Sequence, residues 1–210
     1  MGPTRRPLAD EPAQSGSFCL MVGECGTNMA MAARQPRKPI DPARLDELAL
    51  SYVSRFATSR AKLKTYLARK LRERGWAGDG EPPIDALADR LVRLGYVDDR
   101  AYALAKARTL TSRGYGGRRV RQALMQAGIG DEDSVDANEL SAAEAYQAAL
   151  RFARRRSLGP YASGKPDPQA RERAIAAMIR AGHSFAIAKR IIDLGPGETA
   201  DGGELSNLAD

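Results

Sequence analysis

The chain has 210 residues, 43% of them hydrophobic, and it carries 33 lysines and arginines against 26 acidic residues, a formal net charge of +7. This excess favours an anionic partner, above all nucleic acid, although a basic and merely solvated surface stays an alternative. The apolar stretch from Phe18 to Val22 is too short for a signal sequence or a membrane span, so we expect no membrane partner.

The first forty residues contain frequent glycine, proline and serine and show no helical period, so we expect residues 1–40 to be a disordered extension. Both cysteines, Cys19 and Cys25, lie in this segment, and His183 is the only histidine of the chain. These residues are too few for a zinc site or a disulfide framework. We therefore expect no metal and no cofactor, and a reducing, cytoplasmic setting.

An apolar face with helical spacing begins after Asp41 and Pro42, a pair that commonly starts a helix. Its members are Leu45, Leu48, Ala49, Tyr52, Val53 and Phe56. A second helix, which Ser59 can cap, ends at Gly75, and a third helix follows it. We expect residues 41–97 to form a first three-helix repeat.

Two further repeats follow the same plan. We expect residues 98–139 to form the second, with a last helix that ends at Glu139. The first helix of this repeat is expected to begin at Asp98 and Asp99 and to run through Tyr102, Ala105 and Thr109 to Arg113. Residues 140–195 are expected to form the third repeat, beginning with a helix from Ala142. The tail, residues 196–210, is glycine-rich and acidic, so we expect it to be disordered.

Three glycines, Gly75, Gly128 and Gly182, each end an amphipathic stretch, and they recur at a spacing of about fifty residues, which is typical of a duplicated unit. A unit of this size is only marginally stable by itself and needs neighbours. No segment shows the alternation of a strand. The predicted fold is therefore all-α, with tandem three-helix repeats in an elongated array.

Basic residues concentrate in the first two repeats. The helix from Ser59 to Gly75 carries seven basic residues against one acid, Glu73, and the stretch from Arg100 to Gly130 carries seven basic residues and no acid. Like charges on one helix repel each other, so this pattern favours an anionic partner over a solvated face. Aromatic residues make up only 6% of the chain, which is too few to predict a base-stacking surface.

No enzyme motif stands out. The chain lacks a P-loop, a glycine-rich dinucleotide motif and an H-E-x-x-H pair, so we assign no catalytic residue. The loop from Gly114 to Arg119 can in principle hold a phosphate with backbone amides, but an ordinary turn is the favoured interpretation. We expect His183 to pack or to cap a helix rather than to bind a ligand.

Two segments carry a family resemblance. The chain reads LGYVDD over Leu94–Asp99 and RGYGGRRVRQAL over Arg113–Leu124, and together these segments resemble the RecX family, the bacterial regulators of the RecA recombinase. The resemblance covers about residues 43–194. It implies three-helix repeats in a curved rod that lies in the groove of the RecA filament on DNA. The chain departs from the family at Gly117, where proline is common, and at Ala123, where glutamate is common.

The resemblance implies a non-enzymatic regulator of DNA repair, recombination and the SOS response, with the RecA filament and DNA as partners and occlusion of the groove as mechanism. We expect the chain to be a monomer. The basic positions assigned to RecA or DNA binding are Arg60, Lys62, Lys64, Arg69, Lys70, Arg113, Arg118, Arg119 and Arg121. An independent DNA-binding protein with a basic helix in the major groove is the main alternative, and a scaffold without a nucleic-acid role is a third.

Overall fold

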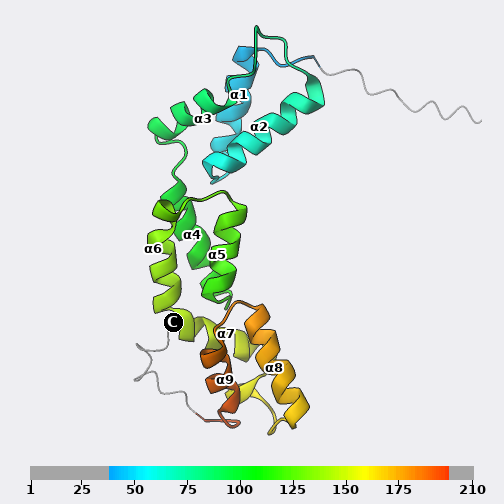
Figure 1. Ribbon diagram of the computed structural model, residues 1–210, viewed down its shortest axis with the longest axis vertical. Coiled ribbons are helices and arrows are strands. Elements are labelled where there is room, and N and C mark those ends of the chain that lie inside the picture. The colour runs from blue at the N-terminus through cyan, green and yellow to red at the C-terminus, as the bar shows by residue number, and fades with distance from the viewer. Residues whose placement is uncertain (1–37, 199–210) are drawn as a thin grey trace, which may run out of the picture. The chain divides into compact units, whose positions relative to one another are not determined.

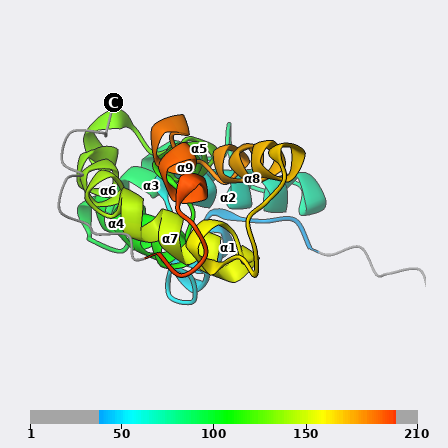
Figure 2. The ribbon, with the colours of Figure 1, turned by 90° about the horizontal axis from the view of Figure 1, so that it is seen from below.

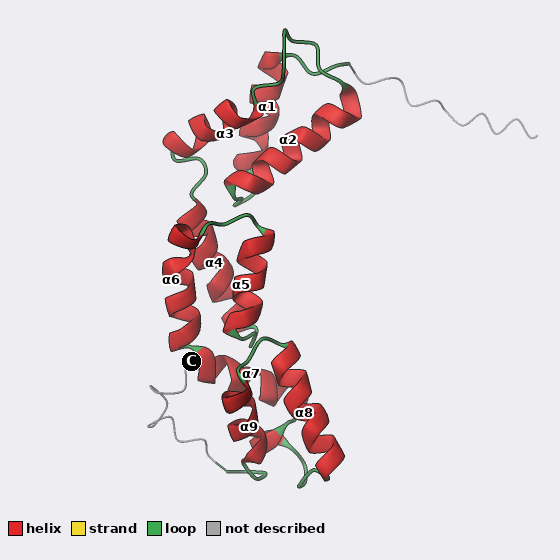
Figure 3. Cartoon of the chain, in the orientation of Figure 1, coloured by secondary structure: helices red, strands yellow, loops and turns green. Residues whose placement is uncertain are grey.

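The computed structural model describes residues 38–198. Within this range nine α-helices and one short 3-10 helix follow one another, and no strand forms (Figures 1 and 3). Figure 2 shows the same helices from a second direction. The predicted all-α class is confirmed. The expected disorder of residues 1–37 and of the tail from residue 199 onward lies outside the described residues, as do both cysteines.

The first three helices are α1 (Pro42–Val53), α2 (Arg60–Arg74) and α3 (Ile84–Arg93). The Asp41 carboxylate caps α1 by accepting a hydrogen bond from a first-turn amide at 2.8 Å, and Ser59 Oγ caps α2 in the same way at 3.2 Å. These helices enclose one apolar core made of Ile40, Leu45, Ala49, Leu63, Leu67, Leu87, Ala88, Leu91 and Val97. Leu94, the residue directly after α3, is 62% exposed and lies outside this core.

The segment before α1 is tied to the end of α2. The Ile40 amide donates to the Gly75 carbonyl at 3.0 Å, and the Ala77 amide donates to the Ile40 carbonyl at 2.9 Å. These bonds make a single parallel bridge between Ile40 and Trp76, and the Ile40 side chain is fully buried. One apolar residue leaves no periodic signal, so this contact is not visible in the sequence.

The next three helices are α4 (Asp99–Ser112), α5 (Gly117–Gln126) and α6 (Asp131–Ala143). The buried face of α4 consists of Ala103, Ala107 and Thr111. Of the residues through which this helix is expected to run, Ala105 and Thr109 are exposed and Tyr102 is half-buried. Small buried side chains let α4 pack closely against α6, which continues past Glu139 with Ser141 on its buried face.

The last elements are α7 (Ala145–Arg156), a 3-10 turn η1 (Gly159–Tyr161), α8 (Pro168–Arg180) and α9 (Phe185–Asp193). Helix α7 begins at Ala145 and not at Ala142, because α6 ends at Ala143 and Glu144 separates the two helices. The apolar core of this last group of helices includes Tyr146, Phe152, Met178 and Ile191. Each group of three helices therefore has its own apolar cluster. The unit boundaries given above stay a prediction.

The central helices of the three groups meet end to end. Ser59 Oγ, at the start of α2, donates to the Ala127 carbonyl just beyond α5 at 2.6 Å. The Gly116 amide, at the start of α5, donates to the Ala181 carbonyl just beyond α8 at 3.0 Å. At each joint, a carbonyl at the C-terminal end of one central helix, which has no partner within its own helix, thus accepts a hydrogen bond from a group at the start of the preceding central helix.

Two of the repeated glycines lie at these joints. Gly128 and Gly182 have φ angles of +69° and +97°, which favour glycine. A Cβ on Gly128 would lie 2.3 Å from the Cβ of Ala61, and a Cβ on Gly182 would lie 2.5 Å from the backbone nitrogen of Arg119. A Cβ on Gly75 would meet no described atom within 4 Å. Gly128 and Gly182 therefore also allow close approach between neighbouring units.

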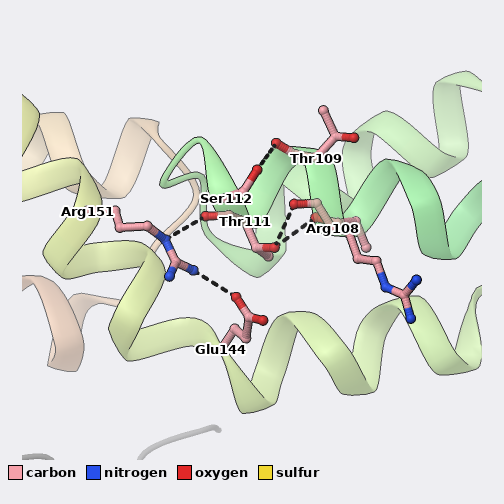
Figure 4. A network of polar contacts seen from close by, with 7 residues as sticks. Arg108, Thr109, Thr111, Ser112, Glu144 and Arg151 are labelled. Atoms are coloured by element: carbon pink, nitrogen blue, oxygen red, sulfur yellow. Dashed lines mark hydrogen bonds and ion pairs between the residues drawn. The ribbon is translucent and has the colours of Figure 1, made fainter.

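The joint between the second and third groups has a further contact, made by Arg151 of α7 (Figure 4). Its Nε donates to the Thr111 carbonyl at 3.1 Å, and its Nη2 donates to the Glu144 carboxylate at 2.7 Å. The hydroxyl of Thr111 donates in turn to the Ala107 carbonyl at 3.0 Å. Arg151 thus satisfies a carbonyl at the C-terminal end of α4, where a positive charge is also favourable.

Replacing Ser59 with alanine is expected to lower the free energy of unfolding by about 2 kcal/mol, because it removes both the cap of α2 and the bond to Ala127. Ser184→Ala is the matched control, since Ser184 caps α9 through Ile187 and no bond from its hydroxyl to another unit is present in the described structure. Urea denaturation followed by circular dichroism measures both losses. Equal losses would show that the bond across the joint contributes nothing.

Candidate nucleic-acid interface

The structure pairs two of the predicted basic residues of α2 with acids of α3. Arg60 binds the Asp89 carboxylate at 2.6 Å, and Lys64 pairs with Asp85. The hydrogen bond and the charge of Lys64 lower the pKa of Asp85. These acids follow α2 in the sequence, beyond the run in which Glu73 is the only carboxylate. The first part of α2 is therefore less positive than its own sequence indicates.

The other three predicted basic residues of α2 also have polar partners. Arg69 and Lys70 lie 3.5 and 2.8 Å from the carboxylate of Glu73. Lys62 donates to the hydroxyl of Tyr102 and lies 4.9 Å from the centre of that ring. Lys62 thus keeps its charge without a carboxylate partner in the part of the chain that the structure describes. These contacts are at the surface, where ion pairs contribute about 0–1 kcal/mol each.

Uncompensated positive charge lies on α5 and in the turn before it. Arg113, Arg118, Arg119 and Arg121 are all exposed. Between residues 38 and 198, no carboxylate lies within 4.0 Å of these four guanidinium groups. Arg119 contacts the neutral side-chain oxygen of Gln122 at 3.0 Å. Helix α5 buries its apolar face and leaves its arginines to solvent, which suits contact with an anionic surface.

Part of the long acid-free run is nevertheless neutralised by a helix that follows it. Arg100 of α4 makes two hydrogen bonds to the Asp136 carboxylate of α6, at 2.6 and 2.8 Å. The hydrogen bond from Arg100 lowers the pKa of Asp136. The positive charge of the second group without a carboxylate partner in the described chain therefore comes from α5, the turn before it, and Lys106 and Arg108 of α4.

A pocket of about 490 Å³ lies between α1 and α2, with one residue of α5 at its edge. It is lined by Ser51, Tyr52, Arg55, Phe56, Lys62, Thr65, Tyr66, Arg69 and Gln126. The rings of Tyr52 and Tyr66 are stacked, with centroids 4.1 Å apart and planes 13° apart. The Phe56 ring lies 5.5 Å from that of Tyr52. The low aromatic content gave no sign of this cluster, because folding brings together rings from two separate segments.

The glycine loop before α5 uses its amides within the protein. The amide of Gly116 donates to Ala181, and the amide of Arg118 donates to the Gly182 carbonyl at 3.2 Å. These donors are not free to hold a phosphate, which agrees with the favoured interpretation of a turn. His183 is buried, and its Nε2 lies 3.2 Å from the Gly114 carbonyl. Burial lowers the pKa of His183, so its ring is neutral at pH 7 and serves packing.

None of the helices between residues 38 and 198 has the length and hydrophobicity needed to cross a bilayer.

The described helices form consecutive three-helix units with exposed basic residues, which defines a helical-repeat protein. Residues 98–137 match the family model described as RecX, second three-helix domain. A protein of Myxococcus xanthus (strain DK1622) named Regulatory protein RecX is 35% identical over 176 residues, which is 78% of this chain and 91% of the relative. The chain belongs to the RecX family of regulatory proteins.

Another relative and two solved structures agree with this assignment. The Regulatory protein RecX of Agrobacterium fabrum (strain C58 / ATCC 33970) is 30% identical over 144 residues, 67% of this chain and 77% of the relative. The crystal structure of RecX from Lactobacillus salivarius has a TM-score of 0.53 at 22% identity and covers 72% of this chain and 94% of that one. A crystal structure of regulatory protein RecX gives 0.54 at 22% identity, over 71% and 70% of the two chains. These structures show the shared fold.

Proposed function

We propose that this protein binds the RecA filament on DNA and inhibits strand exchange and the coupled ATPase. It acts as a cytoplasmic, monomeric regulator without catalytic activity of its own. Membership of a family of regulatory proteins supports the role of a regulator. The observation that carries the choice of partner is the group of arginines on α5 and the preceding turn that have no carboxylate partner within the described chain, Arg113, Arg118, Arg119 and Arg121. A filament that contains DNA offers the phosphates that such a group binds.

Helix α2 provides a second basic contact. Its ion pairs to α3 and to Glu73 lie at the surface, with the side chains of Arg60 and Arg69 about half exposed. Exchanging a carboxylate for a phosphate there costs little, because surface pairs contribute only about 0–1 kcal/mol. The paired residues of α2 therefore stay available to an anionic partner. The arginines of α5 are expected to bind such a partner more strongly, because they are not paired with a carboxylate in the described chain.

The proposed mechanism is occlusion. The joints at Ser59 and Gly116 connect consecutive units through backbone carbonyls, so binding by α2 and α5 carries the third unit with them. In the proposed complex, the third unit contacts a neighbouring RecA subunit. A chain that bridges successive subunits blocks access to the groove and hinders the changes that accompany ATP turnover.

We expect the protein to bind the assembled filament at least about tenfold more tightly than bare DNA of the same length, because contacts to protein and DNA then act together. Fluorescence anisotropy with DNA alone, RecA alone and the filament, at one physiological salt concentration, measures this difference. Equal affinity for bare DNA and filament would reject filament binding. A steep salt dependence on bare duplex would then favour an independent DNA-binding protein.

A further inference from the structure

We propose that the pocket between α1 and α2 binds one unstacked nucleotide of single-stranded DNA, with the base against Tyr52, Phe56 and Tyr66 and the phosphate against the neighbouring cations. This inference rests on the proposed function in that it takes DNA as a partner. It goes further because it names the state of the nucleic acid and a place that recognises a base. The arginines of α5 offer only charge, whereas this pocket combines charge with aromatic faces.

The aromatic side of the pocket is already arranged for stacking. Tyr52 and Tyr66 lie nearly parallel at 4.1 Å, so they hold each other in place before any ligand arrives. Phe56 follows the end of α1 and is 56% exposed, so its ring is accessible to a ligand in the pocket that it lines. A base that enters here covers the exposed ring without a rearrangement of the helices. Stacking on a ring accepts every base, because each has a π face.

The charged side of the pocket selects an anion. Its lining contains three cations, Arg55, Lys62 and Arg69, and no carboxylate. Arg55 is exposed and has no carboxylate within 4.0 Å among residues 38–198. Lys62 is held by the Tyr102 hydroxyl, and Arg69 lies 5.7 Å from the centre of the Tyr66 ring. Cations that border aromatic rings suit a ligand that carries a phosphate next to a planar ring.

The size of the pocket favours an unpaired nucleotide over duplex DNA. A volume of about 490 Å³ lies within the range of pockets for small organic molecules. A base in a duplex can enter such a pocket only after it leaves its stack, at a cost of about a few kcal/mol. A base in single-stranded DNA enters at a much smaller cost. The pocket is therefore expected to prefer single strands.

The test uses the full chain without RecA and compares oligothymidylate with an abasic oligomer of the same length and the same number of phosphates. We expect the wild type to bind oligothymidylate about tenfold more tightly at low salt, which corresponds to one stacked base. Phe56→Ala should remove most of that difference. Phe185→Ala is the matched control, because Phe185 is a phenylalanine on α9 that is 60% exposed and lies outside this pocket. It should keep the full difference.

A second measurement locates the base. Photo-crosslinking of an oligomer that contains 5-iodouracil should give adducts on Tyr52, Phe56 or Tyr66, as mapped by mass spectrometry of peptides. Equal binding of the two oligomers by the wild type, or adducts confined to other units, would overturn the proposal. So would a Phe56→Ala variant that loses affinity for RecA alone but keeps its preference for oligothymidylate, since the pocket would then hold a protein side chain.

The failure of this proposal is distinguishable from a failure of the proposed function. Binding of the oligomers involves no RecA, whereas inhibition of strand exchange tests the filament. If the base preference is absent but the protein still inhibits strand exchange, the pocket proposal fails and the proposed function stands. If Phe56→Ala abolishes the base preference in a protein that has no effect on the filament, the pocket stands and the filament role fails.

Discussion

Replacing Gly116 with alanine is expected to lower the free energy of unfolding by about 3 kcal/mol, because the added methyl group has no space. A Cβ on Gly116 would lie 2.3 Å from the Gly182 carbonyl oxygen and 2.5 Å from the His183 backbone nitrogen. Both are backbone atoms, so the end of α8 must move away from α5. That movement breaks the bond from the Gly116 amide to the Ala181 carbonyl. The third unit is therefore expected to lose its docking to the second.

Gly130→Ala is the matched control for this substitution. Gly130 occupies the same N-cap position, before α6, with φ −73° and ψ 167° against −83° and 170° for Gly116. A Cβ there would meet no described atom within 4 Å. Any general cost of alanine at an N-cap is common to both variants, so the difference between them measures the collision. Urea denaturation gives the two free energies, and hydrogen exchange shows whether α7–α9 open first. Equal destabilisation would mean that the joint does not depend on close approach.

Reversing the charge of Arg118, Arg119 and Arg121 to glutamate is expected to weaken inhibition of strand exchange about a hundredfold, as like charges then face the phosphates. The side chains are exposed and make no ion pair in the described chain, so the helix content should not change. The concentration that inhibits half of the strand exchange, measured with circular dichroism of the same sample, tests this expectation. Inhibition at unchanged concentration would place the contact elsewhere.

A control with the same change in net charge separates position from total charge. Arg173, Arg180 and Lys189 are exposed on α8 and α9, and no carboxylate within the described range lies within 4.0 Å of them. Their reversal to glutamate changes the net charge by the same amount. It should weaken inhibition much less than the reversal on α5. A similar loss in both triple variants would show that only the overall charge of the protein matters.

The sequence predicts the helices well where a local signal marks them. Asp41 and Ser59 cap helices with their own side chains, and the glycines end them, so each signal lies within a few residues of its effect. The buried face of α4 carries no such local signal. Its buried residues, Ala103, Ala107 and Thr111, are small, whereas the larger Tyr102 beside them is only half-buried. Packing against α6 determines which residues of α4 are buried, and that contact joins residues far apart in the sequence.

In the candidate site, too, some features are visible in the sequence and others arise only from contacts between separate helices. The excess of basic residues is readable in the sequence, and Arg118, Arg119 and Arg121 keep their charge without carboxylate partners in residues 38–198. The partners of α2 are not readable, because Asp85 and Asp89 belong to another helix and reach Lys64 and Arg60 only after folding. The aromatic pocket depends in the same way on α1 and α2 lying side by side. Counting residues along one segment misses both effects.

The bridge at Ile40 covers one end of the first described three-helix unit. A repeat array leaves, at its terminal unit, a surface without a neighbouring repeat, and such terminal units need a cap for solubility. Here the chain covers that end with its own backbone, since the Ile40 amide donates to the Gly75 carbonyl and the buried Ile40 side chain belongs to the core against which Trp76 packs. A single residue that precedes the first helix therefore covers the helix end of the first described unit that a neighbouring repeat would otherwise cover.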